Sequence, residues 1–341
     1  MNENPRPSTL GEILDRTAQV YRRNFLLFAG VAALPIGTMM AIGVLGGGFA
    51  LAAGAAARGM AWPQIFAGGA LALMLLVALP VYLVAYVYST AGLTQAAAST
   101  YRGEKTTIGA TLRSVTPRFW RYLGFLLLQA LLVVLIPGAI AGVLIGIPIY
   151  LASSGGVGLA GGVAVGVAMV LVIPAVVIAV VWLLLSYGMG MAVCVVEQKT
   201  ALESLNRAMK LSRGTRGRIF VMFLLVLALT MVVAMIADIP VLIVAGLGAA
   251  AAKGTHGAAS AVIVAEMVNV VVNFSLQTLL APVTWIALLL FYFDQRIRTE
   301  GYDIEWMMEQ AGLTHVAQQA QTGEPTMISG TVLPADSVEE R

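Results

Sequence analysis

Six long apolar segments, separated by short polar stretches, organise this chain. They run approximately over residues 24–57, 60–101, 122–151, 159–196, 219–252 and 258–293. A helix of about 20 apolar residues is enough to cross the hydrocarbon core of a bilayer. Each segment is therefore long enough to span a membrane with some tilt or a kink. The pattern predicts an all-α, polytopic membrane protein with six transmembrane helices.

Three shorter stretches combine apolar and basic residues at helical spacing. They cover approximately residues 9–22, 106–118 and 200–213. Such amphipathic helices lie at the headgroup boundary with their apolar face toward the bilayer. Thr9 and Thr200 are each followed three residues later by Glu, which is the spacing of a capping box. We expect one interfacial helix before each of three helical hairpins.

The three hairpins carry matching features and suggest an internal repeat. The units run over about residues 9–102, 106–197 and 200–298. Around them, residues 1–23 form a cytoplasmic N-terminus with its amphipathic helix, residues 24–300 a transmembrane domain, and residues 301–341 a cytoplasmic tail. Few large apolar residues follow position 318, so the tail is expected to be largely disordered. Proline recurs in the first span of each unit and again in the second, at Pro35, Pro137 and Pro240 and at Pro80, Pro174 and Pro282.

The distribution of positive charge predicts the orientation. Of the twenty Lys and Arg residues, eighteen precede the first apolar segment or follow the second, fourth and sixth; Arg58 and Lys253 lie in the other turns. Short loops rich in Lys and Arg stay in the cytoplasm. We therefore expect a protein of the cell inner membrane with both termini in the cytoplasm.

Composition excludes several classes of protein. Hydrophobic residues make up 59% of the chain and charged residues 11%, against about 25% charged in soluble domains. The basic residues flank apolar spans instead of forming one basic face with stacking aromatics, so nucleic acid is not an expected partner. The expected partners are the lipid bilayer and its anionic headgroups. The candidate headgroup contacts are Arg22, Arg23, Arg118, Arg121, Arg213, Arg216 and Arg218.

A polar stripe on the sixth apolar segment is the most suggestive candidate site. Glu266, Asn269, Asn273 and Gln277 are spaced to share one helical face. Polar and ionisable groups inside a membrane usually face the bundle interior or a water-filled path. Two interpretations stay open, a path for a solute, ion or lipid headgroup, and a packing seam that fixes helix register. Asp238 is expected to cap a second half-helix at Pro240, or else to pair with Glu266.

Catalytic and metal-binding patterns are missing from the sequence. One cysteine and two histidines offer no cluster with metal-ligand spacing, and no phosphate loop or nucleophile elbow appears. We expect neither cofactor nor metal and predict that the chain is not an enzyme. Glycines spaced four apart, as at Gly138, Gly142 and Gly146, favour close helix packing, within the chain, in a homo-oligomer or against a membrane protein partner.

Three stretches of the chain together resemble a known bacterial family. The first consists of RPSTLGEILDR at 6–16 and YRRNF at 21–25. The second consists of Glu197, ALESLNRA at 201–208 and Arg213-Gly214. The third is FYFDQRIRTEGYD at 291–303. This combination resembles the membrane domain of glycerophosphoryl diester phosphodiesterase. In enzymes of that family a separate soluble barrel performs the hydrolysis, and this sequence has no motif for such a barrel. The resemblance thus implies a membrane scaffold and no activity.

The sequence leaves two functions to compare. The first is a non-enzymatic scaffold or accessory protein linked to membrane lipid or envelope processes. The alternative is a transporter or channel for a small solute, ion or lipid headgroup that uses the polar stripe on the sixth segment.

Overall fold

The computed structural model describes residues 7–56, 63–153, 158–251, 258–301, 327–328 and 331–332. Among these residues the regular secondary structure is helical except for a short antiparallel strand pair that aligns Met327 with Val332. The elements are α1 (Leu10–Arg23), α2 (Phe25–Ala56), α3 (Pro63–Tyr101), α4 (Ile108–Val115), the 3-10 turn η2 (Thr116–Arg118), α5 (Phe119–Ala130), the π-helical turn η3 (Leu131–Leu135), α6 (Ile136–Ser153), α7 (Gly158–Tyr187), α8 (Gly190–Val196), α9 (Ala201–Ser212), α10 (Arg216–Ala251), α11 (Ala258–Glu300), β1 (Met327–Ile328) and β2 (Thr331–Val332).

Six helical segments of the described chain are long and apolar enough to cross a membrane. Each contains a stretch of 18 residues that is strongly apolar on average and includes at most two charged residues. The prediction of an all-α polytopic membrane protein with six membrane-spanning segments is therefore confirmed by length and composition. The segments are Phe25–Gly46, Ala72–Tyr101, Ile108–Tyr150, Gly161–Val196, Arg216–Val244 and Met267–Glu300.

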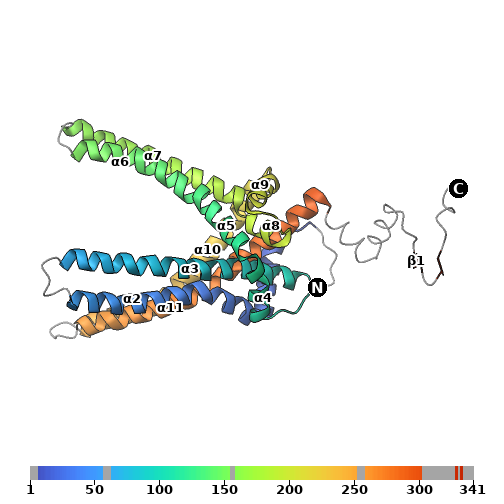
Figure 1. The fold of residues 1–341 in the computed structure, drawn as a ribbon, viewed down its shortest axis with the longest axis horizontal. Coiled ribbons are helices and arrows are strands. Elements are labelled where there is room, and N and C mark those ends of the chain that lie inside the picture. Colours follow the sequence, from blue (N-terminus) through green and yellow to red (C-terminus); the bar gives the residue numbers. More distant parts are fainter. Residues whose placement is uncertain are drawn as a thin grey trace.

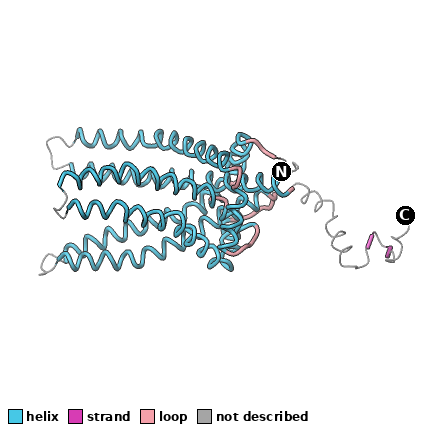
Figure 2. Tube along the Cα trace, turned by 90° about the horizontal axis from the view of Figure 1, so that it is seen from above, coloured by secondary structure: helices cyan, strands magenta, loops and turns pink. Residues whose placement is uncertain are grey.

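Consecutive long helices pack against each other as pairs, α2 with α3, α6 with α7 and α10 with α11. A short helix precedes each pair: α1, α4 and α9. Figure 2 shows the long helices running in one common direction, with the short helices and connecting loops gathered at one end of the bundle. We call this end, which contains α1, α4, α8 and α9, the polar end. Descent of the three pairs from one repeated unit stays a prediction.

The short helices begin where their caps predict. The backbone N–H of Thr9 donates to Oε2 of Glu12 at 2.7 Å, and the Glu12 N–H returns a bond to Oγ1 of Thr9 at 3.3 Å. In α9, the Thr200 N–H donates to Oε2 of Glu203 at 3.2 Å. These bonds satisfy backbone groups that a helix start leaves free. The predicted capping boxes are thus confirmed at both positions.

Two apolar segments that the sequence pattern treats as continuous are interrupted. In the third segment the Ile136 N–H bonds back to the carbonyl of Leu131, which closes a π-helical turn. Pro137 follows at once, and a proline ring crowds the carbonyl four residues earlier, so the wider turn relieves that clash. In the fourth segment α7 ends at Tyr187 and a new helix, α8, starts at Gly190. The fourth segment therefore consists of two helices, although Gly161–Val196 keeps the length and composition of one membrane span.

The break before α8 allows a close contact with α5. A Cβ atom at Gly190 would lie 2.6 Å from the ring of Phe125, which is completely buried. Only glycine lets the backbone come this near the aromatic ring without a shift. Composition alone gives no sign of this contact, because the residues on both sides of the break are equally apolar.

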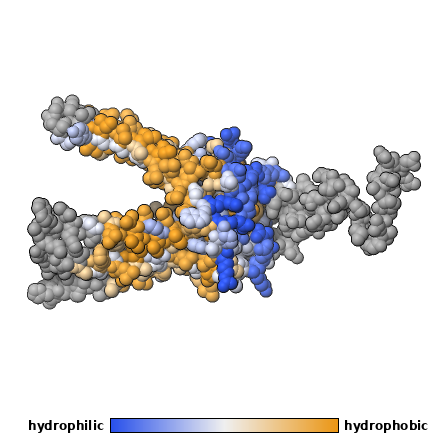
Figure 3. Space-filling model, viewed as in Figure 1, coloured by the Kyte–Doolittle hydropathy of each residue, from blue (hydrophilic) through white to orange (hydrophobic). Residues whose placement is uncertain are grey.

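The helices form a body and a separate arm. Figure 1 shows α2, α3 and α11 side by side, with α10 behind them, whereas the α6–α7 pair diverges from this body toward the end opposite the polar end. In Figure 3 hydrophilic residues form a band at the polar end, and apolar residues cover most of the coloured surface beyond this band. This separation of polar and apolar surface is what a bilayer requires of a protein that spans it.

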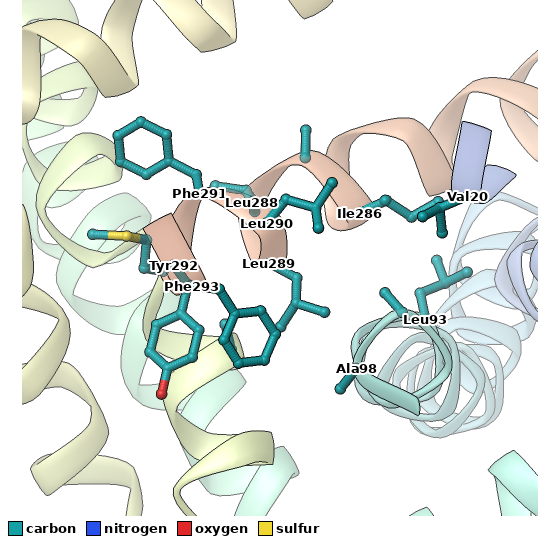
Figure 4. Close-up of a cluster of buried hydrophobic side chains, with 14 of the residues drawn as sticks. Val20, Leu93, Ala98, Ile286, Leu288, Leu289, Leu290, Phe291, Tyr292 and Phe293 are labelled. Carbon is teal, nitrogen blue, oxygen red and sulfur yellow. The ribbon is translucent and has the colours of Figure 1, made fainter. Parts of the chain in front are cut away.

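The core of the protein surrounds the last turns of α11. All residues from Ile286 to Phe293 are at most 6% exposed, so the helix is covered on every side there. Figure 4 shows Leu289 and Phe293 pointing toward Leu93 and Ala98 of α3. The ring of Phe293 also stacks on Tyr101, with centroids 4.5 Å apart. The most buried part of the chain is therefore near the polar end and not at the middle of the spans.

Candidate functional site

A cavity of about 800 Å³ lies within the body, between α2, α3, α10 and α11. Three residues of the predicted polar stripe, Asn269, Asn273 and Gln277, line it from α11. They lie on one face because they are spaced by four residues along the helix. The structure thus brings most of the predicted stripe onto one cavity wall.

The rest of the cavity wall is apolar with scattered hydroxyl groups. Met39 and Ile36 contribute from α2, and Phe274 and Trp285 from α11. Among the described lining residues no side chain carries a charge. The hydroxyl groups belong to Tyr82, Tyr86, Ser89, Thr90, Thr230 and Thr284.

The amides of the stripe bond along α11. Nδ2 of Asn273 donates to Oδ1 of Asn269 at 2.9 Å and to the Asn269 carbonyl at 3.1 Å. A packing seam would need hydrogen bonds to a neighbouring helix, and these two bonds stay within one helix. The arrangement leaves polar groups on a cavity wall, where they can meet a ligand or water.

The two acidic residues of the predicted site have different outcomes. Glu266 lies in α11, but its side chain is outside the described residues. Asp238 is exposed on α10, which continues without a break from Arg216 to Ala251. The expected cap at Pro240 is wrong, because the helix accommodates this proline internally and no second half-helix begins there. Asp238 is also not among the described residues that line the cavity.

A second polar constellation surrounds Asp294 at the polar end. This carboxylate is 3% exposed. It accepts a 2.7 Å hydrogen bond from the backbone N–H of Ser8 and pairs with Arg298 at 2.9 Å and Arg218 at 3.3 Å. Both arginines also donate to the carbonyl of Ser8, at 2.8 and 3.2 Å. Four charged or polar groups from α10, α11 and the segment before α1 thus satisfy one another.

Glu197 organises a neighbouring ion-pair network. Lys199 lies 2.7 Å from its carboxylate and Arg207 3.2 Å. The Tyr292 hydroxyl donates to it at 2.9 Å. Arg207 also pairs with Glu300. The network therefore joins the end of α8, the middle of α9 and the end of α11.

The pKa of Glu197 is lower than that of an ordinary glutamate. Burial alone would raise it, but the hydrogen bonds from Lys199 and Tyr292 and the charge of Arg207 outweigh that effect. The same pairing raises the pKa of the Arg207 guanidinium against its own burial, through Glu300 and Glu197. Both partners thus stay charged at neutral pH.

These two networks connect the three stretches that carry the family resemblance. Ser8 belongs to the first stretch, Glu197 and Arg207 to the second, and Tyr292 and Asp294 to the third. Reasoning from the sequence did not select them as site residues. The signal that could have found them was an acidic residue at the end of an apolar segment, Glu197 after the fourth and Asp294 after the sixth, among many basic residues.

The predicted headgroup contacts separate into two groups. Arg22, Arg23, Arg118 and Arg213 are exposed. Three others have partners inside the protein. Arg121 donates to the Gln198 carbonyl at 2.7 Å, and Arg218 belongs to the Asp294 cluster. The guanidinium of Arg216 lies over the Trp182 ring, 4.6 Å from its centroid.

Metal chemistry gains no support from the part of the chain that the structure describes. No three His, Cys, Asp or Glu side chains there come together in a way that could hold a metal ion. Cys194 is completely buried, with its sulfur 3.7 Å from the Lys199 carbonyl. Its environment is that of a packed core residue.

Comparison with known proteins identifies a family for this chain. No curated protein and no solved structure matches the chain. A family model described as Domain of unknown function (DUF8558) matches residues 67–283. The match begins in α3 and ends in α11, so it includes the stripe side of the cavity and excludes α1 and α2. It does not test the resemblance to the phosphodiesterase membrane domain, which stays a prediction. Because the match covers more than half of the chain, the protein belongs to the DUF8558 family.

Proposed function

We propose that the protein is a non-enzymatic membrane protein that holds a small, uncharged amphipathic molecule in the cavity between α2, α3, α10 and α11. The observation that carries the proposal is the presence of three amides, those of Asn269, Asn273 and Gln277, on the wall of a cavity of about 800 Å³. Ligand pockets typically have volumes of about 300–1,000 Å³ with few, placed polar groups on an apolar wall. The cavity has both properties.

The wall defines the class of ligand. Its apolar side chains, among them Phe274 and Trp285, suit a hydrocarbon body, and its amides and hydroxyls suit hydrogen-bonding groups. The described lining offers no charge to neutralise an ion, and an unpaired charge inside a membrane is costly. A neutral amphiphile therefore suits the cavity better than an ion does. Passage of such a molecule between leaflets would make the protein a transporter, the alternative expected from the sequence.

The proposed setting is the cell inner membrane with the polar end in the cytoplasm. The positive-inside distribution of Lys and Arg supports this orientation. Kinship with the membrane domain of glycerophosphoryl diester phosphodiesterase is part of the same proposal. It is supported by the meeting of the three resembling stretches in the networks of Glu197 and Asp294. The two networks hold α9, α10, α11 and the segment before α1 together and act as a structural support for the cavity.

Thiol labelling tests the proposed cavity. In a Cys194→Ala background, single cysteines replace Asn269, Asn273 and Gln277 and are exposed to a small, membrane-impermeant thiol reagent. We expect labelling at all three, and protection from it when the cavity is filled by the right amphiphile. Ser275→Cys is the matched control. Ser275 lies on the same helix but does not line the cavity, so this cysteine should stay unlabelled. Absence of labelling at all three positions would identify a dry packing seam and overturn the proposal.

A scaffold or accessory function is the second candidate. The observation in its favour is the open face of α6, where a Cβ atom added to Gly138, Gly142 or Gly146 would have no described atom of another element within 4 Å. Small residues at this spacing let a second helix approach closely. We expect Gly142→Ile to abolish co-purification of a membrane protein partner or a second copy, and Ile140→Leu, on the same helix, to leave it intact. Equal co-purification of both variants would reject this interface.

A further inference from the structure

The α6–α7 arm and the body enclose a cleft that is apolar over most of its length. Figure 3 shows the arm separated from the body by an open space with apolar walls, closed only toward the polar end. At that closed end α7 and the turn after it contact α10. Arg216 lies over Trp182 of α7, and a Cβ at Gly188, just after α7, would lie 3.6 Å from the Phe223 ring. Farther from the polar end the two helices diverge.

Both helices beside the cleft present exposed apolar side chains. In α7, Ile178 is 69% and Leu171 65% exposed; in α10, Leu224 is 51% and Leu227 51% exposed. The apolar window of the fourth span has no buried residue. Water in contact with so much apolar surface is unfavourable, so in a membrane this space is filled by hydrocarbon.

The closed end of the cleft carries an unsatisfied positive group. The Nε atom of Arg216 is buried and has no hydrogen-bond partner among the described residues, although its guanidinium lies against Trp182. A buried donor on a charged group is costly to leave unpaired. Arg218, two residues later, contrasts with it, because Arg218 is neutralised by Asp294. Within the described part of the chain, the positive charge of Arg216 therefore has no negative partner at the closed end of the cleft.

Two further features make the closed end of the cleft favourable for binding an anion. Arg216 is the first residue of a helix of 36 residues, and the free N–H groups and dipole of a helix start attract negative charge. Arg213, three residues earlier, is exposed, and the turn between them contains Gly214 with a positive φ of 80°. Charge complementarity thus points to an anionic group that is attached to an apolar body.

We propose that an anionic phospholipid binds in the cleft between α7 and α10, with its phosphate at Arg216 and Arg213 and its acyl chains along the apolar walls. The length of an acyl chain matches the length of the apolar wall that α10 offers. One leaflet of hydrocarbon is about 15 Å thick, half of a bilayer core, which corresponds to about ten residues of helix. An acyl chain that starts at Arg216 therefore reaches about as far as Val226, within the stretch where α10 presents Leu224 and neighbouring apolar side chains.

Native mass spectrometry of the full chain in neutral detergent tests this site. Phosphatidylglycerol is titrated against the wild type, with phosphatidylcholine as the zwitterionic comparison. We expect tighter binding of phosphatidylglycerol, and an affinity at least about tenfold lower in Arg216→Gln. Arg113→Gln is the matched control, because Arg113 is an exposed arginine of the polar end that belongs to α4 and not to the cleft. It should bind phosphatidylglycerol as the wild type does.

A second variant keeps the test decisive if Arg216→Gln does not fold. Arg213 is exposed, so Arg213→Gln is expected to fold, and its affinity for phosphatidylglycerol should fall about threefold. A second readout is the quenching of Trp182 fluorescence by phosphatidylglycerol brominated in its acyl chains, measured as the difference from Trp182→Phe.

Several results would overturn the inference. They are equal affinity in the wild type and both variants, equal binding of the two lipids, or binding without quenching. Displacement of the lipid by millimolar inorganic phosphate would indicate a site for a free anion. Retention of a protein in place of lipid would show that the cleft is a protein interface.

Discussion

The backbone N–H of Ser8 donates a 2.7 Å hydrogen bond to the carboxylate of Asp294, a residue 286 positions later in the chain. This contact connects the segment before α1 to the end of α11. It is reinforced by Arg218 and Arg298, which hold the same carboxylate and also the Ser8 carbonyl. The buried carboxylate of Asp294 thus joins the segment before α1, the start of α10 and the end of α11 at the polar end.

Replacement of Asp294 by Asn should destabilise the protein markedly. Asn keeps the shape of the side chain but leaves Arg218 and Arg298 without their counter-charge. Hydrogen bonds to charged groups contribute about 1.5–3 kcal/mol each, and the partial exposure of both arginines reduces the loss. We expect a net cost of about 2 kcal/mol, measured as a lower midpoint of unfolding in detergent.

The matched control for Asp294 is Asp15→Asn. Asp15 is an exposed aspartate of α1 at the polar end, and the 2.8 Å hydrogen bond that it accepts from Gln19 can also be accepted by Asn. Its replacement should therefore leave the midpoint nearly unchanged. Similar losses in both variants would mean that the Asp294 cluster is not the source of the stability.

The contribution of Glu197 should depend on pH in a defined direction. Its pKa is lowered in the folded protein, since the hydrogen bonds from Lys199 and Tyr292 and the charge of Arg207 outweigh the effect of burial. A carboxyl with a lowered folded pKa stabilises the fold above its unfolded pKa, close to 4.5, and loses that contribution as the pH falls through the folded value. Glu197→Gln should therefore unfold at a lower temperature than the wild type from pH 7 to pH 5.

Below a pH of about 4 the difference between Glu197→Gln and the wild type should shrink, because the wild-type carboxyl then becomes protonated. The measurement is thermal unfolding of both proteins in detergent over this pH series. A difference that stays constant down to a pH of about 3.5 would contradict the assigned pKa direction.

Tyr292 and Glu197 should be energetically coupled. The Tyr292 ring is completely buried, and its hydroxyl donates to Glu197 at 2.9 Å. A double-mutant cycle of Tyr292→Phe and Glu197→Gln should give an interaction free energy of about 1 kcal/mol. The same cycle with Tyr150→Phe, a tyrosine on α6 that is 71% exposed, should give none. Coupling of the same size in both cycles would mean that the hydroxyl contact is not responsible.

Gly190 should tolerate no added methyl group. A Cβ there would lie 2.6 Å from the Phe125 ring, which is enclosed by the core and cannot move freely. Forcing extra volume into a packed core costs typically about 1–3 kcal/mol, and we expect Gly190→Ala to lose an amount in this range, measured as a lower midpoint of thermal unfolding.

Gly166→Ala serves as the control for Gly190. Gly166 lies inside α7 with open space around its Cβ position. Alanine favours helix over glycine by about 1 kcal/mol, so this variant should be as stable as the wild type or slightly more stable. Equal losses at the two glycines would show that the contact with Phe125 is not tight in solution.

Hydrophobic pattern and local caps were enough to predict the main elements. The six segments, the short helices before each pair and the cap of α1 at Thr9 depend on residues close in sequence. The interruption at Gly188 had no such signal, because apolar residues continue on both sides of it. Helical spacing predicted that Asn269 and Asn273 share a face, but it did not predict that this face borders a cavity.

The networks at the polar end were beyond prediction for a different reason. Asp294 and Ser8, like Glu197 and Tyr292, meet only through the tertiary packing of distant helices. In the sequence they appear as ordinary charged and aromatic residues at the ends of apolar segments. The divergence of the α6–α7 arm is likewise a property of the packing, and it determines where the cleft beside Arg216 opens.

The burial of the last turns of α11 also sets an order for biosynthesis. Ribosomes deliver helices to the membrane one after another, so α1 to α10 are in place before Ile286–Phe293 arrives at the centre of the polar end. Until then Arg218 lacks Asp294 and Glu197 lacks Tyr292. The polar end of the nascent chain therefore has unpaired charges until the end of α11 is added, and this late step pairs them.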